Sequence, residues 1–125
     1  MRYSLLLNYS EAAGAEVPPE VMQETMAAFD VYAKSLEASG VLVGADVLQP
    51  TSASTTVTLR NGSLQIQDGP FADTKEQLGG VFLIDVPDLD AALAWAEKCP
   101  AAQWGTVEIR PTGVYFADGA WQPAS

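Results

Sequence analysis

The chain has 125 residues with 16 acidic and 6 basic side chains, a formal charge of −10 and no histidine. This length suits one domain with a single core, and six scattered cations do not make the basic surface that nucleic acid binding requires. Without histidine, proton transfer would depend on carboxylate, Lys, Tyr or Cys, and imidazole is excluded as a metal ligand.

The amino-terminal apolar run is broken by Asn8 and Glu11 before it reaches the length of a signal-peptide core. No later segment approaches membrane-spanning length. The single cysteine, Cys99, excludes an internal disulfide, which suits a reducing compartment. We therefore expect a cytoplasmic protein that makes no contact with a membrane.

The first elements are a strand and a helix. Residues 3–9 are aromatic and leucine-rich, which predicts a largely buried strand, and a loop follows. Pro18 and Pro19 suit a helix start, and Gly40 suits the residue after its end. Between them an apolar stripe at three- and four-residue steps predicts one amphipathic helix, and the stripe consists of Met22, Met26, Phe29, Ala33 and Leu36.

A hairpin is the clearest local prediction. After a short or bulged strand at residues 41–48, residues 55–60 and 63–67 flank Asn61-Gly62, the dipeptide favoured at the centre of a type I′ turn. Closure by two residues puts apolar pairs on one face and polar pairs on the other. The expected pairs are Arg60–Ser63, Leu59–Leu64, Thr58–Gln65 and Val57–Ile66.

The second half repeats the order of the first. We expect a strand at 81–86, a helix at 89–98 with Asp88 as its N-cap, and a strand at 106–110. Residues 1–111 would form the domain. The remaining residues 112–125 are an aromatic tail that we expect to dock on the domain or on a dimer partner.

This order predicts an α+β fold: a ferredoxin-like split βαβ with an inserted hairpin and both helices on one face of an antiparallel sheet. The strands at 3–9 and 81–86 are apolar on both faces, with Leu5 and Leu7 opposed to Leu6 in the first strand. Helices on one side leave the other side uncovered. We therefore expect a homodimer in which two sheets face each other.

The stretch DGPFADTKEQLGG at 68–80 lies between GVLVGADVLQP and VPDLDAALAWAEKCPAA, with VEIRP following. This pattern resembles the YCII-related family, in its DGPF branch, from Arg2 to Pro111. The resemblance implies a dimeric α+β barrel and a regulatory link to extracytoplasmic-function sigma factors. A His–Asp pair proposed as the active site in the YCII branch proper aligns with Phe29 and Cys99, so that chemistry does not carry over.

The stretch at 68–80 has two interpretations. In the structural one, Asp68 bonds its own turn, Asp73-x-x-Glu76 and Thr74-x-x-Gln77 have capping-box spacing for a one-turn helix, and Gly79 ends the turn. In the functional one, Asp68, Lys75 and free backbone N–H groups line the barrel mouth and bind a small polar or anionic ligand. We favour the structural interpretation.

Three further residues are candidates for ligand binding. Glu108 and Arg110 are expected on the uncovered face, where they form ion pairs or contact ligand. Tyr32 either packs in the domain or donates its hydroxyl into the cavity. We expect neither a metal nor a cofactor, although Asp85, Asp88 and Asp90 lie close together, and we expect Cys99 to be inert.

Two functions remain. The first is a dimeric small-ligand-binding or regulatory interaction module whose acidic surface receives a basic partner, such as a sigma factor. The second is a cofactor-free isomerase, lyase or monooxygenase, with Asp68 or Glu108 as base and Lys75 or Arg110 holding the anion that forms. We favour the first.

Overall fold

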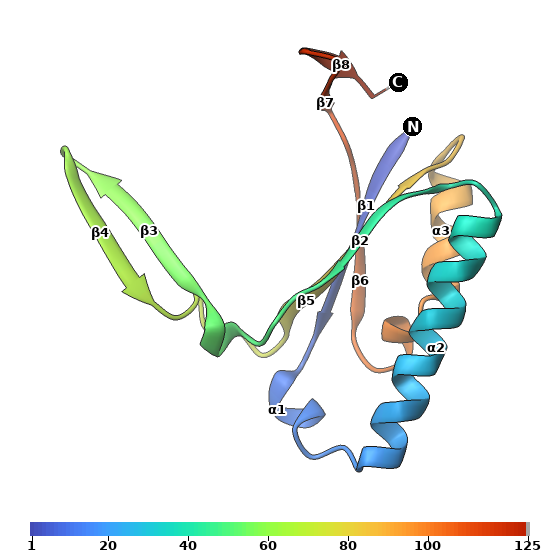
Figure 1. Ribbon diagram of the computed structural model, residues 1–125, viewed down its shortest axis with the longest axis horizontal. Helices are drawn as coiled ribbons and strands as arrows, with labels where there is room; N and C mark the ends of the chain where they lie inside the picture. Colours follow the sequence, from blue (N-terminus) through green and yellow to red (C-terminus); the bar gives the residue numbers. More distant parts are fainter. Residues whose placement is uncertain (125) are drawn as a thin grey trace.

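The computed structural model describes residues 1–124 and is organised around one four-stranded antiparallel sheet in the order β2-β5-β1-β6 (Figure 1). Its strands are β1 (Arg2–Tyr9), β2 (Leu42–Val47), β5 (Gln77–Asp85) and β6 (Thr106–Pro111). Strand β1 pairs with both β5 and β6, and β2 pairs with the outer edge of β5. This confirms the predicted ferredoxin-like α+β fold.

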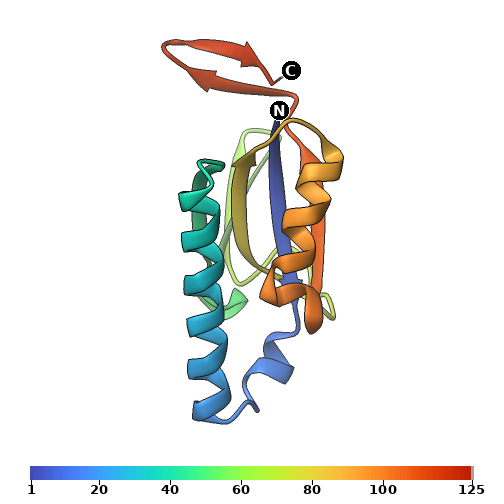
Figure 2. The same ribbon diagram turned by 90° about the vertical axis from the view of Figure 1, so that its right-hand side faces the viewer.

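Two long helices, α2 (Pro19–Ala38) and α3 (Leu89–Lys98), cover the same face of the sheet (Figure 2). Helix α2 begins with proline at its first position, as predicted. Helix α3 begins after Asp88, whose carboxylate accepts a hydrogen bond of 2.9 Å from the Ala91 N–H. None of the helices in residues 1–124 is both long and apolar enough to cross a membrane.

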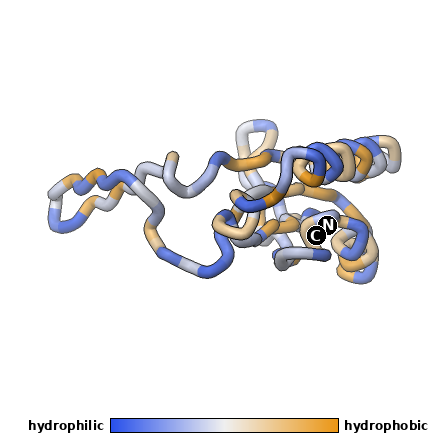
Figure 3. Tube along the Cα trace, turned by 90° about the horizontal axis from the view of Figure 1, so that it is seen from below, coloured by the Kyte–Doolittle hydropathy of each residue, from blue (hydrophilic) through white to orange (hydrophobic). Residues whose placement is uncertain are grey.

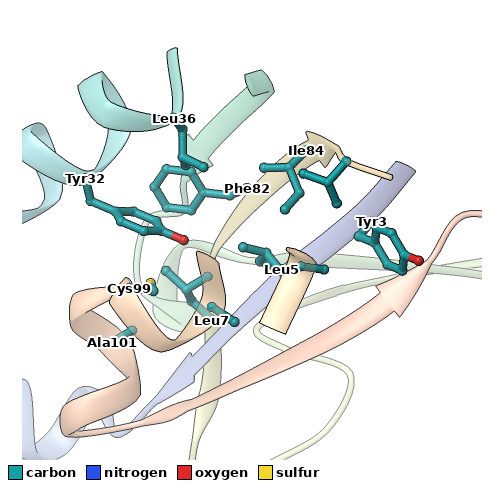
Figure 4. Close-up of a cluster of buried hydrophobic side chains, with 12 residues drawn as sticks. Tyr3, Leu5, Leu7, Tyr32, Leu36, Phe82, Ile84, Cys99 and Ala101 are labelled. Atoms are coloured by element: carbon teal, nitrogen blue, oxygen red, sulfur yellow. The ribbon is translucent and has the colours of Figure 1, made fainter. Parts of the chain in front are cut away.

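The core lies between the sheet and these two helices (Figure 4). Alternate residues of β1 and β5 point into it, because successive side chains of a strand face opposite sides. The largest contributors are Tyr3, Leu5, Leu7, Phe82 and Ile84 from the strands and Tyr32 and Leu36 from α2.

The predicted apolar stripe of α2 is only partly buried. Leu36 is fully buried, but Met26 is 65% exposed and Met22 is 41% exposed. The first half of α2 extends beyond the end of the strands, so this part of the stripe has no sheet beneath it (Figure 2). Tyr32, placed off the stripe by the sequence pattern, is buried in the core instead.

Tyr32 joins the two helices. Its hydroxyl donates a hydrogen bond of 2.8 Å to the carbonyl of Trp95 in the last turn of α3. The Cys99 N–H, which would bond to the Trp95 carbonyl if the helix continued, bonds to the Ala96 carbonyl. The Trp95 carbonyl is therefore one of the groups at the helix end that need another donor. The Tyr32 ring also packs edge-on against Phe82, with centroids 5.2 Å apart. Burial raises the pKa of Tyr32 well above its usual range.

Cys99 follows α3 directly and is 1% exposed. Burial raises the pKa of its thiol, and hydrogen bonds from the backbone of Ala101 and Ala102 only partly oppose this effect. A buried thiol with a raised pKa is a poor nucleophile. Its place in the core supports the expectation that Cys99 is inert.

Two hairpins leave the body of the fold. The first, formed by β3 (Thr55–Arg60) and β4 (Ser63–Asp68), has the predicted register, with Leu59 opposite Leu64. Asn61 and Gly62 adopt φ of 50° and 75°, as a type I′ turn requires. We call residues 55–68 the arm. It extends away from the helices, beyond the open face of the sheet (Figure 1).

The carboxyl-terminal tail forms the second hairpin, with strands β7 (Val114–Ala117) and β8 (Ala120–Pro123). Asp118 and Gly119 close it with φ of 53° and 76°, the same turn chemistry as in the arm. The Arg2 guanidinium lies 3.7 Å from the centroid of the Tyr115 ring, so the hairpin contacts the first strand through this pair.

Three short helical segments complete the fold: α1 (Glu11–Gly14) and the 3₁₀ turns η1 (Thr51–Ala53) and η2 (Pro100–Gln103). The sequence predicted a loop where α1 forms. Ser10 caps α1 by accepting a hydrogen bond of 3.1 Å from the Ala13 N–H.

Replacing Tyr32 with Phe should lower the free energy of unfolding by about 1 to 2 kcal/mol, because the Trp95 carbonyl loses its donor while ring packing is kept. Urea denaturation measures this change. Tyr115→Phe is the control, since the Tyr115 hydroxyl has no hydrogen-bond partner within residues 1–124. Equal denaturation midpoints for the two variants would contradict the assigned role of Tyr32.

Cys99 should react with an aromatic disulfide reagent at least about 100-fold more slowly in the native protein than in concentrated guanidinium chloride. Burial both blocks the reagent and raises the thiol pKa, so a given pH leaves less thiolate. Native and denatured reaction rates that differ by less than tenfold would show that Cys99 is accessible.

Candidate functional site

The open face of the sheet, opposite the helices, has an apolar centre. Leu6 lies directly opposite Val81, and Leu83 lies farther along β5 beside Ser4. All three apolar side chains are partly exposed. The predicted alternation of the two central strands is therefore present, and no helix of residues 1–124 packs along this face (Figure 1).

Glu108 and Arg110 lie on this open face, on β6, opposite Leu6 and Ser4 respectively. The Arg110 guanidinium donates a hydrogen bond to the Glu108 carboxylate at 2.5 Å. The two residues therefore pair with each other. Each partner largely neutralises the charge of the other on this edge strand of the face.

The stretch at 68–80 does not contain the predicted helical turn. Residues 70–76 are irregular, and β5 begins at Gln77, four residues earlier than the sequence indicated. Neither capping box forms. The Thr74 hydroxyl instead donates to the Glu76 carbonyl at 2.5 Å, and the Glu76 carboxylate accepts a hydrogen bond of 2.9 Å from the Thr106 hydroxyl on β6.

Gly79 also differs from its predicted role. It does not end a turn but lies buried within β5. A Cβ atom at Gly79 would lie 2.1 Å from the Tyr9 ring, so only glycine leaves room for that ring. The Tyr9 hydroxyl donates a hydrogen bond of 3.2 Å to the Gly79 carbonyl. The paired glycines of DGPFADTKEQLGG therefore serve strand packing.

The structure does not gather the predicted ligand-binding residues into one site. Asp68 ends the arm, opposite Thr55, and its side chain is exposed. Lys75 is also exposed and forms no ion pair with another described residue. Tyr32 is buried on the helical side of the sheet, where its hydroxyl is used by α3. Tyr32 therefore does not face the predicted cavity.

The arm presents an apolar face that no other element covers. Its four apolar side chains are 60 to 69% exposed, and they are Val57, Leu59, Leu64 and Ile66. They form two directly opposed pairs on one side of the hairpin. Figure 3 shows hydrophobic positions along both strands of the arm, which extends away from the rest of the chain. A two-stranded hairpin is marginally stable at best without such cover.

The charged candidate residues of the open side and the arm differ in whether they are paired. Glu108 and Arg110 neutralise each other, while Asp68 and Lys75 lie in exposed segments without a catalytic partner. No three acidic or cysteine side chains among residues 1–124 converge as metal ligands would. The prominent features of the open side are apolar surfaces.

Sequence reasoning missed both the exposure of the arm and the second hairpin. Asp118-Gly119 carries the same signal as Asn61-Gly62 and could have predicted the tail hairpin. No comparable sequence motif predicts the direction of the arm, because that direction depends on the path of the chain through residues 48–54, between β2 and β3.

Comparison with known proteins identifies the family of this chain. A family model described as the YCII-related domain matches residues 1–113. The chain is 33% identical, over 117 residues, to the uncharacterized protein R00369 of Rhizobium meliloti (strain 1021), and the match covers 92% of this chain and 94% of the relative. Assignment to the DGPF branch stays a prediction. The chain belongs to the YCII-related family.

Proposed function

We propose that the protein is a non-enzymatic binding module that works as a homodimer, with the open sheet face and the arm as its contact surfaces. The observation that carries this proposal is the apolar face of the arm, where Val57, Leu59, Leu64 and Ile66 lie exposed in two opposed pairs. Exposed apolar surface of this kind is typical of an interaction site.

The accessible surface supports a partner of substantial size. The chain exposes 8534 Å². A compact monomer of 13.2 kDa exposes about 6,400 Å². The excess of about 2,100 Å² is larger than the roughly 800 Å² that each partner buries in a standard interface.

The distribution of charge supports the proposal that this partner is a second copy of the chain. The arm carries one basic side chain, Arg60, and one acidic one, Asp68, so its formal charge is zero, whereas the whole chain has a formal charge of −10. The arm is thus a segment that can approach another acidic copy without electrostatic repulsion. On the edge strand β6 of the sheet face, the pairing of Glu108 with Arg110 has the same effect.

The composition of the open sheet face also supports a dimer contact there. Leu6, Val81 and Leu83 form an apolar centre bordered by polar residues, which is the usual composition of a protein interface. Because the arm leaves the sheet on this side, both surfaces can meet one partner (Figure 1). A regulatory link to a sigma factor stays a prediction from the family resemblance.

The wild-type protein should be a dimer at micromolar concentration by light scattering. Replacing Leu59 with Glu and Leu64 with Lys should weaken dimerisation at least about 100-fold, because buried leucines are lost from both copies. The opposite charges pair across the hairpin, so the arm itself should keep its structure.

The matched control replaces Thr58 with Glu and Gln65 with Lys, the directly opposed pair on the other face of the same two strands. This variant should remain a dimer with the wild-type dissociation constant. A monomeric wild type would refute the homodimer, and equal weakening by both variants would show that the apolar face of the arm is not the contact.

A further inference from the structure

A cavity of about 460 Å³ lies on the helical side of the fold, between α1 and the first half of α2. Its volume is within the range of small-molecule sites. Six segments line it: the end of β1, α1, the loop between α1 and α2, α2 itself, the end of β2 and the residue after η2. Figures 1 and 2 show α1 beside the first turns of α2, at the end of the sheet from which the arm leaves.

The inner wall of the cavity is an aromatic cluster. Tyr9 and Trp104 meet edge-to-face with centroids 5.0 Å apart, and Phe29 meets Trp104 at 6.2 Å. The rings contact one another, so they do not form an open cage for a cation. Met22 and Met26 contribute to the outer wall, where their flexible thioethers can adapt to an apolar ligand.

The outer wall formed by α1 is held in place although this helix has only four residues. The Glu11 carboxylate accepts two hydrogen bonds of 2.8 Å, from the Thr51 N–H and the Thr51 hydroxyl. The Glu11 N–H donates to the Gln77 side-chain oxygen at 2.9 Å. These contacts to η1 and β5 mean that the cavity is preformed.

The chemistry of the lining selects an uncharged ligand. None of the described residues that line the cavity has a charged side chain. The hydroxyls of Tyr9 and Thr25 already donate to the carbonyls of Gly79 and Val21. Burial, and then the negative charge of Glu11, raise the pKa of Tyr9, which keeps this hydroxyl neutral. An anion would also meet a protein of formal charge −10 and find no cation to pair with.

We infer that this cavity binds one small, uncharged, hydrophobic molecule with an aromatic ring system, packed against Tyr9, Phe29 and Trp104. This goes beyond the homodimer, because the whole cavity belongs to one chain. Such a molecule would cover the exposed apolar side chains in the first half of α2, which are Val21, Met22 and Met26.

The test uses two naphthalene probes that differ in charge. The uncharged probe N-phenyl-1-naphthylamine should bind saturably with one molecule per chain and should change tryptophan emission, because Trp104 lines the site. Its sulfonated analogue, 8-anilinonaphthalene-1-sulfonate, should bind at least tenfold more weakly. Equal or tighter binding of the anionic probe would overturn the assigned ligand class.

A matched pair of variants on α2 locates the site. Met26→Glu places a carboxylate in the lining and should weaken binding of the uncharged probe at least tenfold. Val31→Glu makes the same kind of change at a residue of similar exposure, 68% against 65%, outside this cavity, and should leave binding unchanged. Equal effects of the two changes would overturn the site.

Measuring probe binding at several protein concentrations tests the cavity independently of the proposed homodimer. Probe affinity should be the same below and above the concentration at which light scattering detects dimers. If the probe binds only the monomer, a second copy fills the cavity and the inference is wrong. A monomeric protein that still binds the probe would refute the homodimer and leave the cavity assignment supported.

Discussion

The structure depends on a sheet whose two central strands are apolar on both faces while both helices pack on one. In β1, Leu5 enters the core and Leu6 faces the open side, and the same alternation in β5 separates Phe82 from Val81. Successive side chains of a strand point to opposite faces of the sheet. When one set is buried under the helices, the other set therefore lies on the open face. The uncovered side of the fold is therefore built into its central strands.

The two sides of the sheet then offer different kinds of binding. The open side carries a flat apolar centre and the arm, which together suit a large protein surface. The helical side carries a concave, preformed cavity within one chain. Glu11 connects the two regions physically, since it is the first residue of α1, the helix that forms the outer wall of the cavity, and it hydrogen-bonds to Thr51 before the arm.

Local rules predicted the elements well and the polar contacts poorly. Asn61-Gly62 determined the register of the arm, and Asp88 determined the start of α3, because a tight turn and a helix cap need only neighbouring residues. Capping-box spacing at 73–77 was misleading. In the fold, Glu76 bonds to Thr106 on β6 and Gln77 already belongs to β5, so long-range pairing outweighs a short helical turn there.

The sequence by itself determined the order of strands and helices, the alternation of apolar faces and the family, because periodicity and turn chemistry act over a few residues. Only the tertiary structure decided which distant groups meet. Tyr32 reaches Trp95, Tyr9 lies over Gly79, and Glu11 holds Thr51 through contacts between residues 40 to 70 positions apart. The cavity and the exposed arm have the same origin. Both arise where an element extends beyond the sheet that would otherwise cover it, and no local pattern encodes where the sheet ends.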